Sequence, residues 1–275
     1  MPRRRNSRRR ASGSLRRGAV RVGHRGFRAL RRASAPVQVL AGLAVLVAAW
    51  LALNGIYQVV RKPSELFFPV AGTLNKAPAE TWRSYAPLFR KYSTALISPE
   101  LLAALAQVEG AGNPVARTYW RWSLRPRPFD IYRPASSAVG MYQLTDGTFA
   151  IARRYCIRDH RVVADGPWND WGSCWFNGLY SRVIPSHAVE LTAAYLDLDA
   201  AALLGRYRMR RAASPERVRE LAALIHLCGA GAADAFVRRG MHLGADERCG
   251  DHSALDYVTR VEFYAREFMR LAAAD

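Results

Sequence analysis

Acidic residues are missing from the first 62 positions of this 275-residue chain, which hold 15 of its 41 lysines and arginines. The remaining positions hold 26 basic and 22 acidic side chains, so most of the net charge of +19 belongs to the N-terminal part. Residues 1–35 are rich in arginine and serine and poor in large apolar residues, which predicts a disordered, cytoplasmic tail. The tail lacks helical periodicity and zinc-ligand spacing, so we expect no nucleic-acid partner.

Several motifs for cofactors and nucleophiles are also missing. The chain has no phosphate-binding glycine loop, no dinucleotide fingerprint and no nucleophile elbow. Its histidines are scattered, without a spacing that places two of them on one helix face, so we expect no metal site. Internal repeats are absent, and strand-like alternation is scarce and short. These absences leave a mainly α domain that works without a cofactor.

One long apolar run is present, from Pro36 to Val60, and no residue in it is charged. About 20 apolar residues span a bilayer as a helix, so we predict a transmembrane helix at 36–60. The alternative is a cleaved signal peptide, but its apolar region has only about 7–15 residues and no small-residue cleavage site follows here. Thirteen arginines precede the run and only Arg61 and Lys62 follow it directly, which predicts that the N-terminus lies in the cytoplasm.

All four cysteines follow this run, on the side expected to lie outside the cytoplasm. Their spacings match no CxxC pattern, and an oxidising compartment allows two disulfides. Four cysteines can be joined into two disulfides in three ways. The pairs Cys156–Cys174 and Cys228–Cys249 close the shortest loops, so we favour them. Four independent buried thiols are the alternative.

Helix signals dominate the outer part of the chain. Residues 61–94 are expected to form a linker or lead-in, where prolines at 63, 69, 78 and 87 interrupt any long helix. A mainly α domain is predicted for residues 95–275. Serines at 98, 186, 214 and 253 are each expected to begin a helix, and Gly229 is expected to end the third of them.

Glu109 is the strongest candidate for a catalytic group. It follows Leu102, Leu105 and Ala106 at helical spacing, which places it on or beside a buried stripe, and Gly110 follows at once. A carboxyl group there faces the negative end of the helix dipole and an apolar wall, which together favour the protonated form that a general acid requires. A solvated glutamate at a frayed helix end is the alternative.

Five segments occur in the order of known motifs: ISPELLAALAQVEGAGNPVA, SSAVGMYQLTDGTFA, VELTAAYL, HLCGAGAADAF and DYVTRV. Over about residues 95–265 the chain thereby resembles the soluble lytic transglycosylases, which share a goose-type lysozyme-like fold. The resemblance implies that Glu109 is the catalytic acid and base. It also implies substrate-binding places for Gly140, Met141, Gln143 and Tyr257, with His226 as a further candidate. Tyr257 is equally well explained as a core aromatic residue.

Three positions depart from the family pattern. Gly110 stands where the family has serine, Met141-Tyr142 replace Leu-Met, and His226-Leu227 replace Tyr-Asn. The resemblance still implies an inner-membrane enzyme with a periplasmic domain that cleaves peptidoglycan glycan strands to 1,6-anhydro ends, with envelope proteins as further partners. A hydrolase on the same fold is an alternative and would need a second acid, for which Asp130 or Asp146 is best placed. A catalytically inert protein that binds peptidoglycan is a further alternative.

The segment 117–135 is longer than the family needs, and it interleaves basic and aromatic residues. Aromatic rings stack on sugars, and arginines pair with the carboxylates of peptide stems. The same mixture suits single-stranded nucleic acid, but the expected compartment argues against that ligand. Equally, the segment is explained as a loop that packs its own aromatics over the domain. Its members are Arg117, Arg121, Arg125, Arg127 and Arg133 with Tyr119, Trp120, Trp122, Phe129 and Tyr132.

Overall fold

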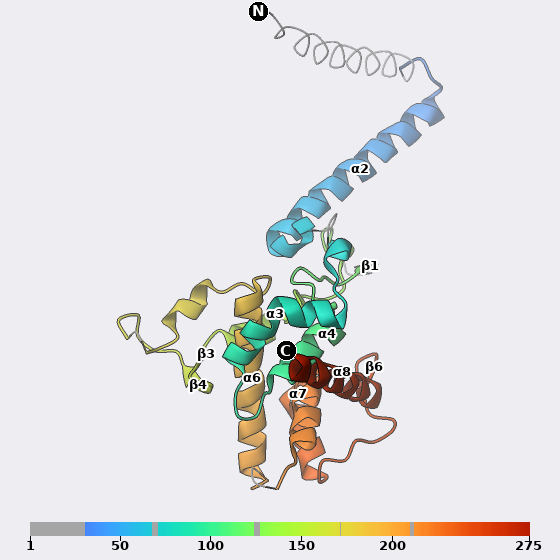
Figure 1. Cartoon of the computed structure of the whole chain (residues 1–275). Coiled ribbons are helices and arrows are strands. Elements are labelled where there is room, and N and C mark those ends of the chain that lie inside the picture. Colours follow the sequence, from blue (N-terminus) through green and yellow to red (C-terminus); the bar gives the residue numbers. More distant parts are fainter. Residues whose placement is uncertain (1–30, 68–70, 124–126, 171, 210–211) are drawn as a thin grey trace, which may run out of the picture. The chain divides into compact units, whose positions relative to one another are not determined.

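The computed structural model describes residues 31–275 except 68–70, 124–126, 171 and 210–211. Most of the tail predicted to be disordered, residues 1–30, therefore lies outside the described residues. The chain divides into two compact units, Met1–Tyr57 and Gln58–Asp275, and the boundary falls inside helix α2, Ala35–Arg61. The two units are described separately, and Figure 1 labels their elements.

Helix α2 contains the predicted apolar run. Its side chains are largely uncovered by protein: Val45 and Leu46 are 66% and 67% exposed, and only 6% of its most apolar stretch is buried. Water disfavours such a surface, so an apolar helix of this length near the N-terminus fits a membrane span or a signal sequence. Helix α7, Pro215–Arg238, is also long and apolar, but 44% of its most apolar stretch is buried within the second unit.

The second unit is mainly α-helical, as predicted, with three short two-stranded antiparallel sheets among its described residues. The sheets pair β1 with β2 (Trp120–Trp122 and Tyr132–Pro134), β3 with β4 (Tyr155–Arg158 and Arg161–Ala164), and β5 with β6 (Arg248–Cys249 and His252–Ser253). Its remaining helices are η1 (Pro63–Phe67), η2 (Ala71–Leu74), α3 (Pro78–Tyr92), α4 (Pro99–Gly110), α5 (Asp146–Ala152), η3 (Trp175–Leu179), α6 (Pro185–Arg206) and α8 (Ala254–Ala274).

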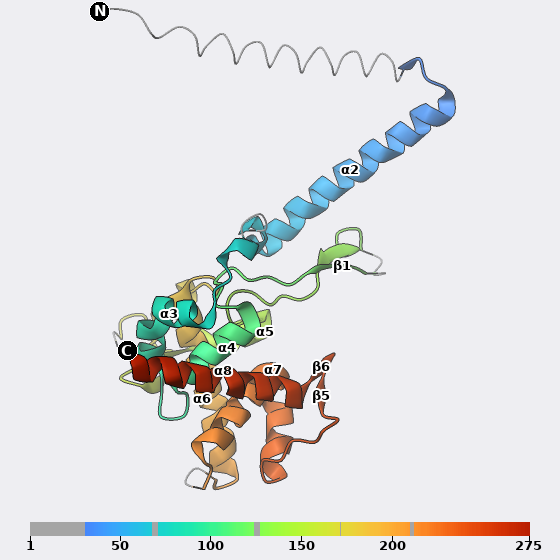
Figure 2. The same ribbon diagram turned by 45° about the vertical axis from the view of Figure 1, so that its right-hand side comes forward.

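Helix α4 forms the centre of this unit. Its residues 101–106 are all buried, and it packs mainly on α8 and α3, while α6 packs on α7. Figure 2 shows α8 crossing the unit beside α4. The buried aromatics Phe89, Phe236 and Phe268 fill the space between these helices. The central helix therefore delivers its C-terminal residue, and Glu109 just before it, from a rigid core.

The helix starts were predicted correctly at three serines. Ser98, Ser214 and Ser253 each accept a hydrogen bond from the backbone N–H three residues later, which satisfies an otherwise unpaired donor. The prediction for position 186 is wrong, because α6 begins at Pro185 and its N-cap, Ile184, has no side-chain acceptor. Gly229 leaves helical geometry, with φ 78°, so the helical segment that begins after Ser214 ends there as predicted, and a second segment of α7 follows the kink.

The prediction that prolines exclude a long helix from the lead-in is wrong. Helix α3 runs for 15 residues with Pro78 in its first turn and Pro87 inside it. An internal proline costs a helix about 3 kcal/mol. Burying a large apolar side chain is worth about 1.5–3 kcal/mol, and α3 buries both Trp82 and Phe89. Packing therefore outweighs the cost, and most of residues 78–94 belong to the domain.

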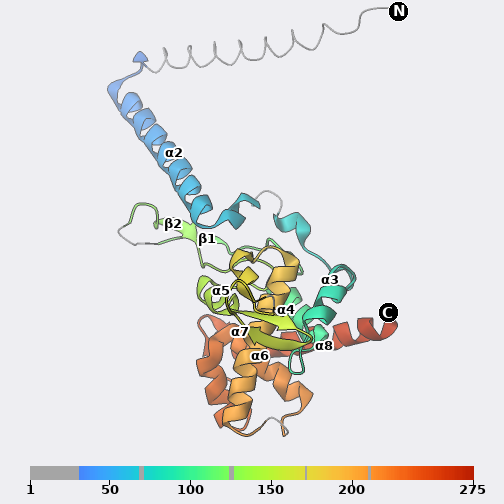
Figure 3. The same cartoon turned by 90° about the vertical axis from the view of Figure 1, so that its left-hand side faces the viewer.

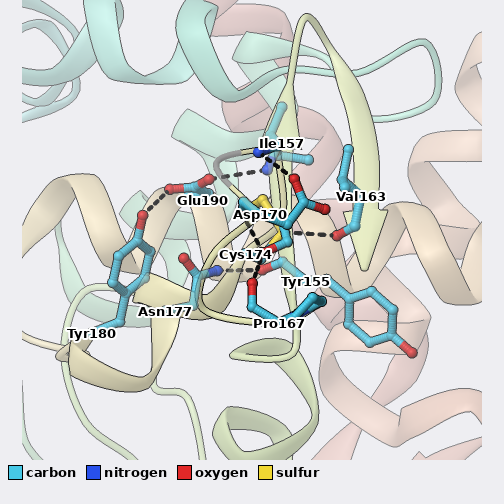
Figure 4. The surroundings of a disulfide bond; sticks show 12 residues. Tyr155, Ile157, Val163, Pro167, Asp170, Cys174, Asn177, Tyr180 and Glu190 are labelled. Carbon is cyan, nitrogen blue, oxygen red and sulfur yellow. Dashed lines mark hydrogen bonds between the residues drawn. A yellow bond between two sulfur atoms is a disulfide. The ribbon is translucent and has the colours of Figure 1, made fainter. Parts of the chain in front are cut away.

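Both predicted disulfides are present, so the alternative of four free thiols is excluded. Cys156–Cys174 ties β3 to the segment before η3, and Figure 4 shows its surroundings. Next to it the buried Glu190 accepts hydrogen bonds from the Ile157 N–H at 3.0 Å and the Tyr180 hydroxyl at 2.7 Å. Cys228–Cys249 ties α7 to the β5–β6 hairpin, which leads directly into α8.

Replacing Cys228 and Cys249 together with serine should lower the free energy of unfolding by about 3 kcal/mol. The disulfide closes a loop across a sequence separation of 21 residues, and its loss restores entropy to the unfolded chain. Urea unfolding of the full chain in detergent, with and without reductant, measures the effect. Reductant should affect this variant less than the native chain, because only Cys156–Cys174 remains. Four alkylatable thiols in the purified full chain, kept free of reductant, would contradict the pairing.

Candidate active site

Glu109 lies in the last turn of α4, where the buried helix reaches the surface. Ala111 takes a left-handed conformation (φ 48°) and ends the helix, as the glycines around it led us to expect. The Glu109 side chain is 18% exposed and lines an open pocket of about 510 Å³. The other lining residues come from η2, the end of α4 and the loop after it: Ala71, Gly72, Asn75, Gln107, Val108, Gly110, Ala111, Asn113, Ala116 and Arg117.

Tyr257 of α8 holds one oxygen of the Glu109 carboxyl group. Its hydroxyl donates a hydrogen bond to Glu109 Oε1 at 2.5 Å. Burial raises the pKa of Tyr257 well above its usual range, and the nearby Glu109 charge raises it further, so the phenol stays protonated and remains a donor. Oε2 of Glu109 has no hydrogen-bond partner among the described residues. The second oxygen is therefore left for a ligand in the pocket.

His226 of α7 lies behind the same carboxyl group. Its Nε2 is 3.6 Å from Glu109 Oε1 and 3.0 Å from the carbonyl oxygen of Tyr142. A carbonyl only accepts hydrogen bonds, so Nε2 carries the proton. The side chain is 7% exposed, which leaves little surface for a substrate. His226 thus lies next to Glu109 within the core, and the substrate contact expected of it stays a prediction.

The turn at 139–144 is built by internal contacts. Gly140 has φ +80°, and a Cβ there would overlap the carbonyl oxygen of Arg182. The Gln143 amide donates to the carbonyl oxygens of Gly140 at 2.8 Å and Ala116 at 3.1 Å. The Met141 side chain is fully buried, and the substrate-binding place expected for this residue stays a prediction. The turn beside Glu109 therefore explains the presence of Gly140 and of the Gln143 amide.

Gly110 is explained by the close approach of the same turn. A Cβ at Gly110 would lie 2.9 Å from the Cα of Met141 and 3.1 Å from the Cβ of Ala116. Real Cβ atoms do not approach backbone so closely, since overlap costs more than contact gains. A side chain at this position would therefore force the turn to shift away from the end of α4.

The two acids proposed as second carboxylates do not line the pocket of Glu109. Asp130 is buried and lies 3.5 Å from Arg61 and 3.8 Å from Arg127. Asp146 accepts a hydrogen bond from Arg182 at 2.8 Å and lines a different pocket. Among the described residues that line the Glu109 pocket, Glu109 is the only carboxylate.

Asn113 and Glu65 shape the site, and the sequence analysis assigned neither of them a role. Asn113 is buried, accepts from the Val115 N–H at 2.9 Å and donates to Asn75, which joins the lead-in to the loop after α4. Glu65 is also buried and accepts hydrogen bonds from Arg117 and Trp120, each at 2.8 Å. The Asn-Pro pair after Glu109 was the available signal for Asn113, whereas nothing local marked Glu65.

The described residues of the 117–135 segment form the β1–β2 hairpin, which extends away from helices α3 to α8 (Figure 3) and contacts Glu65 of η1 through Trp120. Trp122 packs on Tyr132 with ring centroids 4.6 Å apart, as expected for a loop that packs its own aromatics. Tyr119 and Trp122 are nevertheless 71% and 67% exposed. Arg125 lies outside the described residues.

Comparisons of the chain with protein-family models, curated proteins and solved structures found no match. Within the described part of the chain, no group of three or more His, Cys, Asp or Glu side chains is arranged to hold a metal ion. The geometry around Glu109 is therefore the feature that bears most directly on function.

Replacing Tyr257 with phenylalanine should lower the rate of a reaction catalysed by Glu109 by about 10–100-fold. Hydrogen bonds to charged groups are worth about 1.5–3 kcal/mol, and this one orients the Glu109 carboxyl group. The change should appear in kcat and leave KM nearly unchanged, because Tyr257 is buried away from the pocket surface. Tyr264→Phe on the same helix is the matched control. Equal rates for the two variants would remove the role assigned to Tyr257.

Proposed function

We propose that this chain is a membrane-anchored lytic transglycosylase that cleaves the MurNAc–GlcNAc bond of peptidoglycan, on a lysozyme-like fold. The supporting observation is the state of Glu109, a single carboxyl group in an open pocket with one oxygen held by Tyr257 at 2.5 Å and the other unoccupied. A carboxyl group fixed in this way can present its free oxygen repeatedly to one position, as general acid–base catalysis requires.

Glu109 would act twice in the reaction. As an acid it gives its proton to the glycosidic oxygen, and the bond from C1 of MurNAc to that oxygen breaks. As a carboxylate it then takes the proton of the MurNAc 6-hydroxyl, whose oxygen bonds to C1. The product is a 1,6-anhydro end, the acid form of Glu109 is restored, and water is not consumed.

A single carboxylate among the described residues of the pocket favours transglycosylation over hydrolysis. Ordinary glycosidases use two carboxyl groups, about 5–9.5 Å apart, that flank the bond. Here Asp130 and Asp146 are engaged with arginines elsewhere, and Glu109 alone lines the pocket among the described residues. A single group that changes between acid and base explains cleavage without a second one.

A periplasmic position for the domain completes the proposal. The apolar helix α2 would cross the inner membrane with its arginine-rich N-terminal side in the cytoplasm. Two disulfides in the second unit support an oxidising compartment, because thiols stay reduced in the cytoplasm.

Mass analysis of products tests the proposal directly. The full chain in detergent, incubated with purified sacculi, should release muropeptides that are lighter by one water than hydrolysis products. Release of the heavier products would identify a hydrolase. Binding to sacculi without release of any muropeptide would identify an inert peptidoglycan-binding protein.

A further inference from the structure

A second, smaller pocket of about 120 Å³ lies away from Glu109, and its lining is strongly basic. Its cations are Arg61 and Lys62 at the end of α2, Arg133 of β2, and Arg182 before α6. The hydroxyl-bearing residues Ser136 and Ser137 also line it. All of its residues belong to the second unit, Gln58–Asp275.

The positive charge of this pocket is only partly balanced. Asp146 is the only acidic residue among the described residues that line it, and it is already paired with Arg182. Two acids lie outside the lining: Glu65 is 3.3 Å from Lys62 and also pairs with Arg117, and Asp130 is 3.5 Å from Arg61 and is shared with Arg127. Burial lowers the pKa of Lys62; the neighbouring Glu65 opposes this shift, and the charge of Arg182 adds a smaller lowering. An anion in the pocket would relieve this crowding of cations.

Arg133 provides a second observation that points to an anion-binding site. Its Nε is buried and has no hydrogen-bond partner among the described residues. Buried donors in folded proteins are almost always satisfied, because an unpaired one has lost its bonds to water without replacement. A planar guanidinium group is suited to two parallel hydrogen bonds with an oxyanion.

We infer that this pocket binds the phosphate group of an anionic phospholipid. The place of the pocket in the chain identifies the source of the phosphate. Arg61 and Lys62 directly follow the uncharged run 36–60, so they lie where an apolar helix leaves the bilayer and where headgroups gather. This step depends on the membrane anchoring included in the proposed function. A net negative headgroup would complement the pocket, whereas the cation of a zwitterionic headgroup would be repelled.

Lipid binding to the full chain in detergent tests the inference. Short-chain phosphatidylglycerol, short-chain phosphatidylcholine and inorganic phosphate are titrated at constant ionic strength, and binding is measured by calorimetry. Arg133→Gln should weaken phosphatidylglycerol binding by about tenfold, the value of a charged hydrogen bond. Arg127→Gln is the matched control, because Arg127 has an 80% exposed side chain in the same hairpin and does not line the pocket.

A second variant in the pocket distinguishes a loss of binding from a loss of folding. The side chain of Arg61 is 55% exposed, so Arg61→Gln should fold normally and also weaken phosphatidylglycerol binding, by about threefold or more. Equal binding by both pocket variants and the native chain would overturn the inference, as would equal binding of phosphatidylcholine. Inorganic phosphate that binds as tightly as phosphatidylglycerol would show a site for free anions instead of lipid.

The result of the lipid-binding test can be distinguished from the result of the glycan-cleavage test. Glu109→Gln should bind phosphatidylglycerol as the native chain does, whatever happens to glycan cleavage. Extraction of cell membranes with alkaline carbonate tests the anchor itself. Release of the chain by carbonate would overturn the lipid inference through its premise and leave the cleavage chemistry intact.

Discussion

Replacing Glu109 with glutamine is expected to lower the release of anhydro-muropeptides from sacculi by at least about 10²–10⁴-fold. This is the usual value of general acid–base catalysis, and in the proposed mechanism one group performs both halves of the reaction. The amide keeps the shape of the side chain, and its oxygen can still accept the Tyr257 hydrogen bond. It cannot deliver or take up the proton. Product release is measured by chromatography and mass spectrometry.

The control for this variant comes from the same helix. Glu100 lies in the first turn of α4, away from the pocket, so Glu100→Gln should keep the native rate. Both variants should bind sacculi and unfold at nearly the native urea concentration. Native rates of anhydro-muropeptide release by Glu109→Gln would show that the proposed mechanism is wrong.

Replacing Gly140 with alanine is expected to lower the free energy of unfolding by about 2–5 kcal/mol. An L-residue with a left-handed backbone costs about 1–2 kcal/mol, and overlap with a rigid neighbour adds about 1–3 kcal/mol. Both costs apply here, because Gly140 has φ +80° and its Cβ would meet the backbone of Arg182. Urea unfolding of the full chain in detergent measures the loss. Cleavage should also fall, because the turn supports Glu109 through His226.

Gly147→Ala is the matched control, seven residues further on in α5. Its nearest non-neighbouring atom to a new Cβ would be 4.0 Å away, and its backbone is helical. Alanine there should change the unfolding free energy by less than about 1 kcal/mol, in the stabilising direction. A similar loss of stability in both variants would contradict the account of Gly140.

Local chemistry explains most of what was predicted correctly from the sequence. A serine hydroxyl caps a helix with atoms three residues apart, so Ser98, Ser214 and Ser253 could be recognised without any tertiary information. The uncharged run of α2 is likewise a property of consecutive residues. The two disulfides followed from short loop lengths, since near neighbours in sequence meet most readily.

The features that the sequence did not reveal depend on contacts between residues far apart in the chain, which sequence spacing does not encode. Pro87 argued against a helix, but the burial of Trp82 and Phe89 in the core outweighed its local cost. The substrate-binding roles expected of Gln143 and Met141 from the motif around them stay predictions, but their internal contacts could not be read from sequence spacing. The structure uses the Gln143 amide to hold a turn and places Met141 fully in the core.

The sequence by itself determined the apolar helix, the helical character of the outer domain, the helix caps and a glutamate at the end of a buried stripe. Only the tertiary structure decided what surrounds that glutamate. Tyr257 lies 148 residues away in sequence and reaches it from α8, and His226 reaches it from α7. Helix propensity and capping act over a few residues, whereas this cluster depends on how α4, α7 and α8 pack. Packing is a property of surfaces that meet only after the chain has folded.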